Sequence, residues 1–273
     1  RISDIMKNID STYTYEDEKK DDRKRAILII LIVILFLICS AGVIYLVWTF
    51  YNLNKSADFY TDIRNSYVDE VEQGPQDTRP ENPIDFKPLQ QRNSDVYAWL
   101  VVPNTKINYP ILQNDQTDFY LRRSIDKGYL FAGCIYTNKV NSKDFTDPVT
   151  LVYGHNMRDD TMFCMLHRFE DEKFFKENKY FYIYTPDSKL TYEIVSALKY
   201  DNRRITKAYD FSDPEQITDY HYSILNPKYE LFNSRNIELT LDTKIVTLST
   251  CVANRPSYRY LVNGVLIDNE PTK

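Results

Sequence analysis

Apolar positions along the chain fall into one unbroken run near the N-terminus and alternating runs after about residue 93. Residues 26–50 contain no charged side chain, and this run exceeds the roughly 20 residues that a helix needs to cross a bilayer. The preceding flank is basic, with Lys19, Lys20, Arg23, Lys24 and Arg25. Because basic flanks stay in the cytoplasm, we predict a cytoplasmic tail over 1–25, a single transmembrane helix over 26–50 and an extracellular remainder on the cell membrane.

Two alternatives to a retained anchor agree less well with this run. A cleaved signal peptide has a short apolar core and a small-residue cleavage site, whereas here the chain stays apolar through Trp48. A lipoprotein cysteine at Cys39 would follow a small residue, but Ile38 precedes it. The permanent anchor is therefore the favoured interpretation.

Alternating and apolar runs predict short β-strands from about residue 98 onward. Eight segments show such runs, at 98–102, 106–112, 130–136, 148–153, 180–184, 190–200, 244–251 and 258–267. Eight strands with few helices favour a mainly β domain built as a closed or nearly closed barrel. We place this domain at 93–273.

The remaining segments predict a linker and a few helices. Residues 51–92 form an extracellular segment, helical to about residue 67 and a Gly- and Pro-containing linker from 74 to 83. Apolar residues at helical spacing predict a short helix from Met162 to Phe169, with Thr161 as its cap. The long connection 201–241 is expected to contain a helix near 213–225, and connections of that length often shape a binding site.

Charge and cysteine content exclude several function classes. The formal net charge is −5. The sequence outside the predicted span shows no basic face of the kind that binds nucleic acid. Cys134, Cys164 and Cys251 lie outside the predicted span. Their odd number and their spacings match neither a disulfide framework nor a metal site, so at least one thiol is free or paired with another molecule. Cys164 and His167 form only half of a zinc-type pair.

One thiol stands at the end of a predicted strand. Ser249 and Cys251 point to the same face of strand 244–251, and residues 254–257 resemble a loop before the returning strand. If the hairpin is symmetric about Arg255, Cys251 and Arg259 lie opposite each other. A facing cation favours a thiolate and can hold a developing oxyanion. Cys134, by contrast, is predicted to be an inert core residue.

Histidine is scarce, with three in the chain. His155 follows the apolar strand at 149–153 and so lies at a second strand end, where a rigid scaffold presents functional side chains. His167 lies off the apolar stripe of its helix, and His221 lies in the long connection; both are expected to be surface or half-buried polar residues. Cys251 with His155 therefore predicts nucleophilic catalysis.

These residues resemble the sortases of Gram-positive bacteria, and more narrowly class B. The resemblance rests on Thr-Leu-Ser-Thr-Cys at 247–251 with the following Arg259, and on Tyr-Gly-His-Asn-Met at 153–157. Supporting stretches lie at 93–100, 105–111, 120–121 and 158–163. They occur in collinear order from residue 93 to the C-terminus, which is far more specific than one short motif.

The resemblance implies an eight-stranded sortase barrel behind a membrane anchor, a thiol transpeptidase reaction and no metal or other cofactor. Cys251 would attack the threonine carbonyl of an Asn-Pro-x-Thr-like sorting signal on a surface protein. An amine of a cell-wall precursor or a pilin would then resolve the thioacyl enzyme. His155 would act as general acid and then base, and Arg259 would hold the oxyanion.

The resemblance also implies a substrate groove. Tyr153, Ser249 and Leu121 would line it, together with Thr117, which stands where many relatives carry asparagine. Arg255 is a rival for the oxyanion role, but antiparallel geometry favours Arg259 and places Arg255 at the loop apex.

Two other functions use the same features. A membrane-anchored cysteine peptidase would hydrolyse surface peptides with the same Cys251 and His155 and would differ only in the acyl acceptor. A non-catalytic surface-binding module would have an unreactive Cys251, whereas an exposed low-pKa thiolate reacts readily.

Overall fold

The computed structural model describes residues 2–67, 79–227 and 232–273. The chain divides into two compact units, Arg1–Asn52 and Leu53–Lys273. The first unit is the major part of one long helix, and the second contains all of the β-structure.

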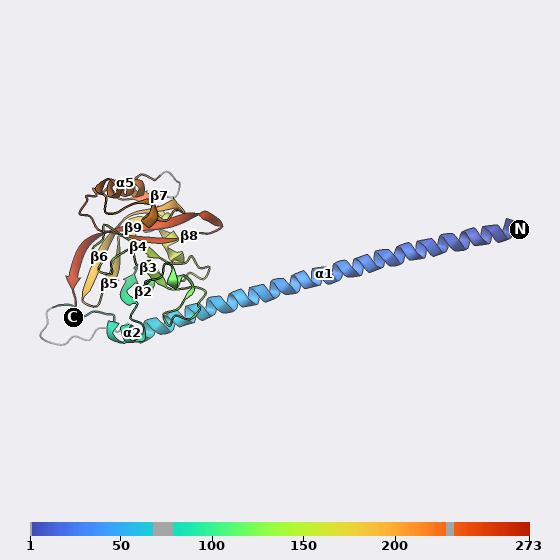
Figure 1. The fold of residues 1–273 in the computed structure, drawn as a ribbon, viewed down its shortest axis with the longest axis horizontal. Helices are drawn as coiled ribbons and strands as arrows, with labels where there is room; N and C mark the ends of the chain where they lie inside the picture. The colour runs from blue at the N-terminus through green and yellow to red at the C-terminus, as the bar shows by residue number, and fades with distance from the viewer. Residues whose placement is uncertain (1, 68–78, 228–231) are drawn as a thin grey trace. The chain divides into compact units, whose positions relative to one another are not determined.

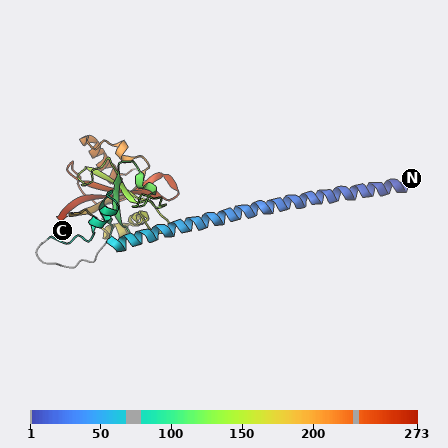
Figure 2. The same ribbon diagram turned by 60° about the horizontal axis from the view of Figure 1, so that its bottom comes forward.

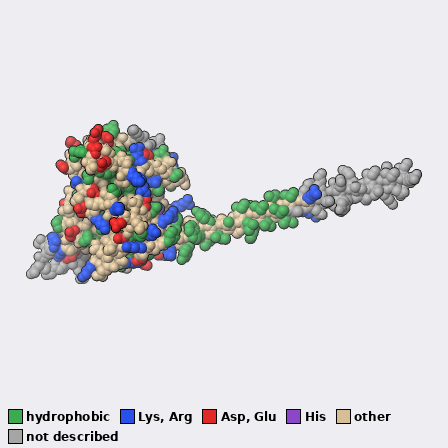
Figure 3. Space-filling view, in the orientation of Figure 1, with side chains coloured by type: hydrophobic (Ala, Val, Ile, Leu, Met, Phe, Trp, Pro, Cys, Tyr) green, Lys and Arg blue, Asp and Glu red, His purple; other side chains and the backbone are tan. Residues whose placement is uncertain are grey.

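Helix α1 (Ile2–Tyr67) ends at the residue that the sequence predicts. The part from Ile27 onward is long and apolar enough to cross a membrane, by length and composition. Figure 3 shows hydrophobic side chains covering this helix beyond its basic flank. The end of α1 belongs to the second unit, where Tyr60 and Ile63 are buried and the Tyr60 hydroxyl donates to the carbonyl of Gly133.

Eight strands form a closed β-barrel, as predicted, in the order β5-β1-β2-β3-β4-β8-β9-β6, and β6 pairs again with β5 (Figures 1 and 2). Their bounds are β1 (Val96–Val101), β2 (Asn108–Asn114), β3 (Ile135–Asn138), β4 (Val149–Tyr153), β5 (Tyr180–Tyr184), β6 (Ser188–Asp201), β8 (Ile245–Val252) and β9 (Arg255–Pro271). A ninth strand that the sequence did not predict, β7 (Phe232–Ser234), pairs with the second half of β6. The pairs β2–β3 and β4–β8 are parallel, and the other pairs are antiparallel.

Short helices precede β1 and lie in the connections between the strands. They are α2 (Phe86–Arg92), η1 (Phe119–Arg122), η2 (Cys164–Glu170), α3 (Glu172–Glu177), α4 (Ile205–Ala208) and α5 (Pro214–Leu225). The predicted helix near 213–225 is α5, which lies outside the barrel (Figure 1). The predicted helix after Thr161 is the 3₁₀ segment η2, and Thr161 does not cap it because its hydroxyl donates to Asp159 instead.

Three hydrophobic clusters account for the burial of both barrel faces. The first fills the interior, where Val246, Leu248 and Tyr260 meet side chains of η2 such as Leu166. The second covers the outer face beside α2 and the end of α1. The third covers the outer face beneath α4 and α5. Strands buried on both faces carry nearly continuous apolar residues, which explains why simple alternation misplaced some strand ends.

Strand β3 begins later than predicted because of Gly133. This glycine has φ of +58°, and a Cβ there would overlap the backbone carbonyls of Tyr120 and Leu121. A left-handed residue ends regular extended structure, so residues 130–134 pack against η1 outside the ladder. Strand pairing starts only at Ile135.

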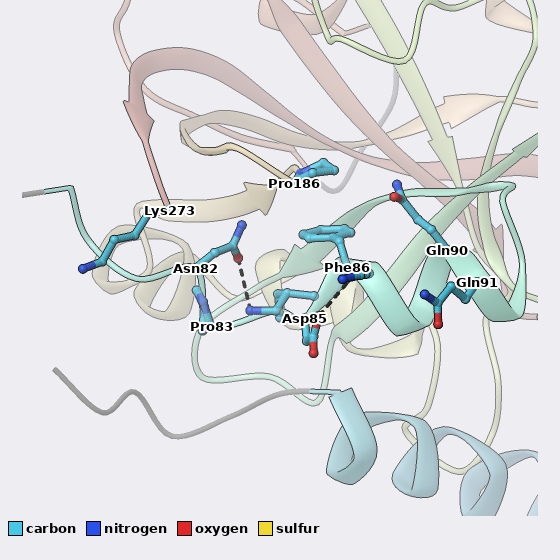
Figure 4. Close-up of a pocket in the computed structure, with 10 residues that line it drawn as sticks. Asn82, Pro83, Asp85, Phe86, Gln90, Gln91, Pro186 and Lys273 are labelled. Carbon is cyan, nitrogen blue, oxygen red and sulfur yellow. Dashed lines mark hydrogen bonds between the residues drawn. The ribbon is translucent and has the colours of Figure 1, made fainter. Parts of the chain in front are cut away.

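A cavity of about 720 Å³ lies where α2, the β5–β6 turn and the C-terminus meet. Figure 4 shows Phe86 of α2, Pro186 of the turn and Lys273 around it. Asp85 caps α2 there by accepting from the backbone N–H of Lys87. Its described lining includes none of the predicted site residues, so the candidate chemistry lies elsewhere.

The packing around Gly264 gives a test of the barrel interior. Gly264 on β9 faces the stacked rings of Phe181 and Tyr192, and an added Cβ would overlap the Phe181 ring. We expect Gly264→Ala to lower the free energy of unfolding by about 1–3 kcal/mol, the usual cost of overpacking. Gly128→Ala, whose Cβ would meet only Ser124 Oγ at 4.0 Å, is the matched control. Thermal and denaturant unfolding would measure both, and equal stabilities would contradict the interior assignment.

Candidate active site

Two strand pairings bring the predicted site residues to one edge of the barrel. Strand β4 runs parallel to β8 with Tyr153 beside Ser249, and the N–H of Gly154 donates to the Ser249 carbonyl at 3.2 Å. The chain therefore continues into His155 beside the end of β8 that carries Cys251. Strand β9 returns antiparallel to β8, and Cys251 pairs directly with Arg259. The predicted cross-strand pairing of residues 251 and 259 is confirmed.

Cys251 is exposed at the strand end, and the Arg259 side chain is half-buried beside it. Arg259 Nη1 donates to the carbonyls of Tyr258 at 2.9 Å and Pro256 at 3.2 Å. These bonds orient the guanidinium, while its Nε and Nη2 still carry N–H donors. The arrangement presents a fixed cation on the face of the hairpin that carries the thiol.

Arg255 does not lie at a loop apex, contrary to the sequence prediction. It is the first residue of β9 and pairs with Val252, so the turn consists of Ala253 and Asn254. Asn254 has φ of 57°, a left-handed backbone that asparagine tolerates. The ladder shifts between Cys251 and Val252, and the extra residues after Arg255 form a bulge. Because cross-strand partners share a face, Arg255 lies with Val252, on the face opposite Cys251.

His155 is half-buried and held by η1. Its Nε2 lies 2.7 Å from the carbonyl oxygen of Leu121. A carbonyl only accepts, so Nε2 carries the proton and the neutral ring keeps a lone pair on Nδ1. Burial lowers the pKa of His155 below 6.5, although the Leu121 carbonyl favours the charged form; the nearby Arg122 lowers it further. The histidine is thus set up to be neutral and able to take a proton.

The predicted substrate-binding residues lie around this edge with different exposure. Tyr153 is half-buried, Ser249 is buried, and Leu121 and Thr117 are exposed. Tyr153 contacts both outer hydrophobic clusters, and burial raises the pKa of its hydroxyl. The backbone carbonyl of Leu121 accepts the hydrogen bond from His155.

An ion pair that the sequence did not reveal joins two segments beside Tyr153. The guanidinium of Arg204, at the start of α4, contacts the carboxylate of Asp118, which follows Thr117. Tyr136 donates to the same carboxylate at 3.1 Å. Asp118 and Arg204 are 86 positions apart, so no local sequence signal links them.

The other cysteines and histidines fall into different environments. Cys134 is buried in the second cluster, and burial raises the pKa of its thiol to about 12. Cys164 is half-buried, and burial raises its pKa too. His221 is buried in α5 and has a lowered pKa for the same reason. Among the described residues, no three His, Cys, Asp or Glu side chains cluster as metal ligands.

Two residues that sequence reasoning did not select touch the cysteine strand. The side-chain amide of Asn156 donates to the carbonyl of Cys251 at 2.8 Å. His167, which the sequence suggested to be merely a surface or half-buried residue, is half-buried but has its Nε2 3.1 Å from the same carbonyl. Asn156 could have been noticed because it follows His155 directly, whereas nothing near His167 in the sequence indicates this contact.

Comparison with known proteins identifies the family. A family model described as the sortase domain matches residues 100–267. Sortase B of Listeria monocytogenes is 30% identical over 186 residues, covering 67% of this chain and 74% of that protein. Among solved structures, sortase B from Bacillus anthracis in complex with AAEK1 has a TM-score of 0.67 at 27% identity, covering 80% of this chain and 99% of that one. Clostridium perfringens sortase B has a TM-score of 0.61 at 32% identity, covering 67% and 100%.

The buried position of His155 predicts a measurable titration. We expect its pKa to lie below 6.5, so the unfolded chain binds more protons than the native one between the two pKa values. The stability that the neutral ring contributes is therefore present above pH 6.5 and is lost as the pH falls through the folded pKa. NMR titration of histidine-labelled protein, with His155→Asn to assign the signal, would measure it. A pKa at or above 6.5 would contradict the burial argument.

Proposed function

Because this chain belongs to the sortase family and is a class B cysteine transpeptidase, we propose that it cleaves a C-terminal sorting signal of the Asn-Pro-x-Thr kind after threonine. It then transfers the threonine carbonyl to a primary amine at the cell surface, on a cell-wall precursor or a pilin. Cys251 is the nucleophile, His155 the proton carrier and Arg259 the oxyanion donor in this proposal. The observation that carries it is the meeting of these three residues at one barrel edge through the β4–β8–β9 register.

The first half of the reaction forms a thioester. The neutral His155 takes the proton of the Cys251 thiol, and the sulfur attacks the threonine carbonyl carbon. The carbonyl oxygen becomes an oxyanion beside the Arg259 guanidinium, which needs no reorganisation because its Nη1 is already held by backbone carbonyls. His155 gives its proton to the leaving amine as the peptide bond breaks. The peptide downstream of threonine departs with a new amino group.

The second half forms an amide. The acceptor amine attacks the thioester carbonyl while His155 takes one of its protons, and a second oxyanion forms beside Arg259. Collapse expels the Cys251 sulfur, which recovers the proton from His155. The enzyme returns to its starting state, and no cofactor takes part in any step.

The half-buried Tyr153 and the buried Ser249, together with the exposed Leu121 and Thr117, are proposed to line the signal-peptide groove. Support comes from the β4–β8 pairing, which sets Tyr153 beside Ser249 on the face that carries Cys251. The Asp118–Arg204 ion pair lies near Tyr153 and is proposed to border this groove.

The membrane arrangement is also part of the proposal. We propose that residues 1–25 stay in the cytoplasm and that 26–50 span the membrane. Residues 51–92 then connect the span to the catalytic domain at 93–273, which acts outside the cell. The apolar helix from Ile27 and its basic flank support this arrangement. An outward-facing site has direct access to surface proteins and to wall amines.

The nucleophile assignment is tested with the full chain in detergent, a fluorogenic panel of sorting-signal peptides, and oligoglycine as acceptor. We expect signal cleavage with an amine-linked product, and we expect Cys251→Ala to abolish both, because no other described thiol is exposed at a strand end. Mass spectrometry identifies the products. Hydrolysed peptide without amine capture would indicate a peptidase, and cleavage by Cys251→Ala would refute the nucleophile.

The oxyanion assignment is tested by comparing two arginines of the same hairpin. Losing one oxyanion donor costs about 100- to 1,000-fold in turnover, so Arg259→Ala and Arg259→Lys should each lose that much. Lysine should not compensate because it lacks the planar fork of donors. Arg255→Ala, on the opposite face, should keep most of the rate. The reverse order of effects in steady-state kinetics would exchange the two roles.

A further inference from the structure

A histidine and glutamate pair lies beneath the hairpin that carries Cys251 and Arg259. His167 Nδ1 is 2.6 Å from Glu170 Oε1, both in η2, and the two side chains are 22% and 31% exposed. The carboxylate only accepts, so Nδ1 carries a proton. Glu170 thereby fixes the orientation of the ring, as carboxylates do for functional histidines.

The other edge and the face of the His167 ring contact neighbours of all three site residues. Nε2 lies 3.1 Å from the carbonyl of Cys251 and 3.1 Å from the side-chain nitrogen of Asn156, which follows His155. The ring stacks on Tyr260, which follows Arg259, at 4.8 Å between centroids. The His167 side chain therefore contacts Cys251 itself and the residues that directly follow His155 and Arg259.

Asn156 completes this network with its two amide hydrogens. One is donated to the Cys251 carbonyl at 2.8 Å, and the second can be donated to the Nε2 lone pair of the neutral His167 ring. In a charged ring Nε2 would instead donate directly to the Cys251 carbonyl. In either form the carbonyl of the nucleophile residue stays tied to η2 and to the residue after His155.

Other ties hold the β9 side of the hairpin, where Asn202 donates from its backbone N–H to the Ser257 carbonyl at 3.1 Å and from its side-chain amide to the Pro256 carbonyl at 3.4 Å. On the β8 side, the carbonyl of Cys251 itself is contacted by Asn156 and His167. Cys251 and residues 253–257 are exposed, and Asn254 has a left-handed backbone. An exposed two-residue turn is held in place mainly by what contacts its base. Errors of about 1 Å in the placement of a reacting group can cost about 100-fold in rate.

We propose that His167, oriented by Glu170 and bridged by Asn156, is a positioning residue that sets the placement of Cys251 relative to His155 and Arg259. This inference rests on the proposed nucleophilic role of Cys251. His167 touches the Cys251 backbone and not its thiol, so it acts on the rate of the chemical step and leaves the binding of the signal peptide to the groove residues.

Two substitutions of His167 separate hydrogen bonding from packing. His167→Phe keeps a ring to stack on Tyr260 but cannot hydrogen-bond, and His167→Gln gives up the ring but can place an amide nitrogen near the position of Nε2. We expect His167→Phe to lose about 10- to 100-fold in kcat with KM nearly unchanged, and His167→Gln to keep most of the rate. A role in packing alone predicts the opposite order.

A neighbouring carboxylate provides the control. Glu170→Ala should lower kcat as His167→Phe does, whereas Glu172→Ala should not, because the ion-pair partner of Glu172 within the described residues is the exposed Lys176 at 2.5 Å in α3. The full chain in detergent is assayed for kcat and KM with the signal peptide that it cleaves best, and for the rate of Cys251 alkylation by iodoacetamide. Alkylation is expected to change in His167→Phe and Glu170→Ala but not in Glu172→Ala. Thermal unfolding confirms that each variant is folded.

Defined results would overturn the inference. Wild-type kcat in His167→Phe, or a slower His167→Gln than His167→Phe, would refute it while leaving Cys251 as the nucleophile. A raised KM with unchanged kcat would place His167 in substrate binding instead. If Cys251→Ala itself retained turnover, the proposed function would fail, and that outcome is distinguishable because it does not involve η2.

Discussion

Parallel hydrogen bonding between β4 and β8 sets which residues can meet where both strands end. Parallel strands point the same way, so the residues after Tyr153 and after Ser249 leave the barrel at the same edge. That edge receives His155 from one strand and Cys251 from the other. A one-residue shift in this register would turn one of the two side chains to the opposite face. The antiparallel return of β9 then needs only a short turn to add Arg259.

Burial on both faces makes this register rigid. The barrel interior and two outer clusters cover the central strands, and Tyr153 contacts both outer clusters just before His155. The site therefore stands on a closely packed base while its own residues remain partly open to solvent. Partial burial also has an electrostatic consequence, because desolvation lowers the pKa of His155. In the proposed mechanism this neutral histidine takes the proton of the Cys251 thiol.

The hairpin tip contrasts with that base. Its residues are exposed, and its backbone is tied to the rest of the unit through Asn156 and His167 at Cys251 and through Asn202 at Pro256 and Ser257. Segment η2, which supplies His167, also packs into the interior cluster through Leu166 and Phe169. Packing of the interior is thus linked to the position of the exposed cysteine through one short 3₁₀ segment. A substitution that loosens the packing of η2 would therefore also displace Cys251.

Local pattern determined much of this protein. The apolar run at 26–50, the eight strands, the end of α1 near Tyr67 and helix α5 all follow from local composition, pattern and segment length, and the pairing of Cys251 with Arg259 follows from counting along a hairpin. Each of these depends on residues close together in the chain. The eight-stranded barrel also agrees with the family resemblance that the two short motifs carry.

Tertiary structure decided what depends on distant residues. The late start of β3 requires the contact of Gly133 with η1, and the strand β7 requires the edge of β6. The true turn at Ala253 and Asn254 requires a bulge that symmetry about Arg255 does not predict. The placement of His167 beneath Cys251 joins positions 84 residues apart. Sequence periodicity reports which face of an element is apolar, but only the folded chain reports which distant group that face meets.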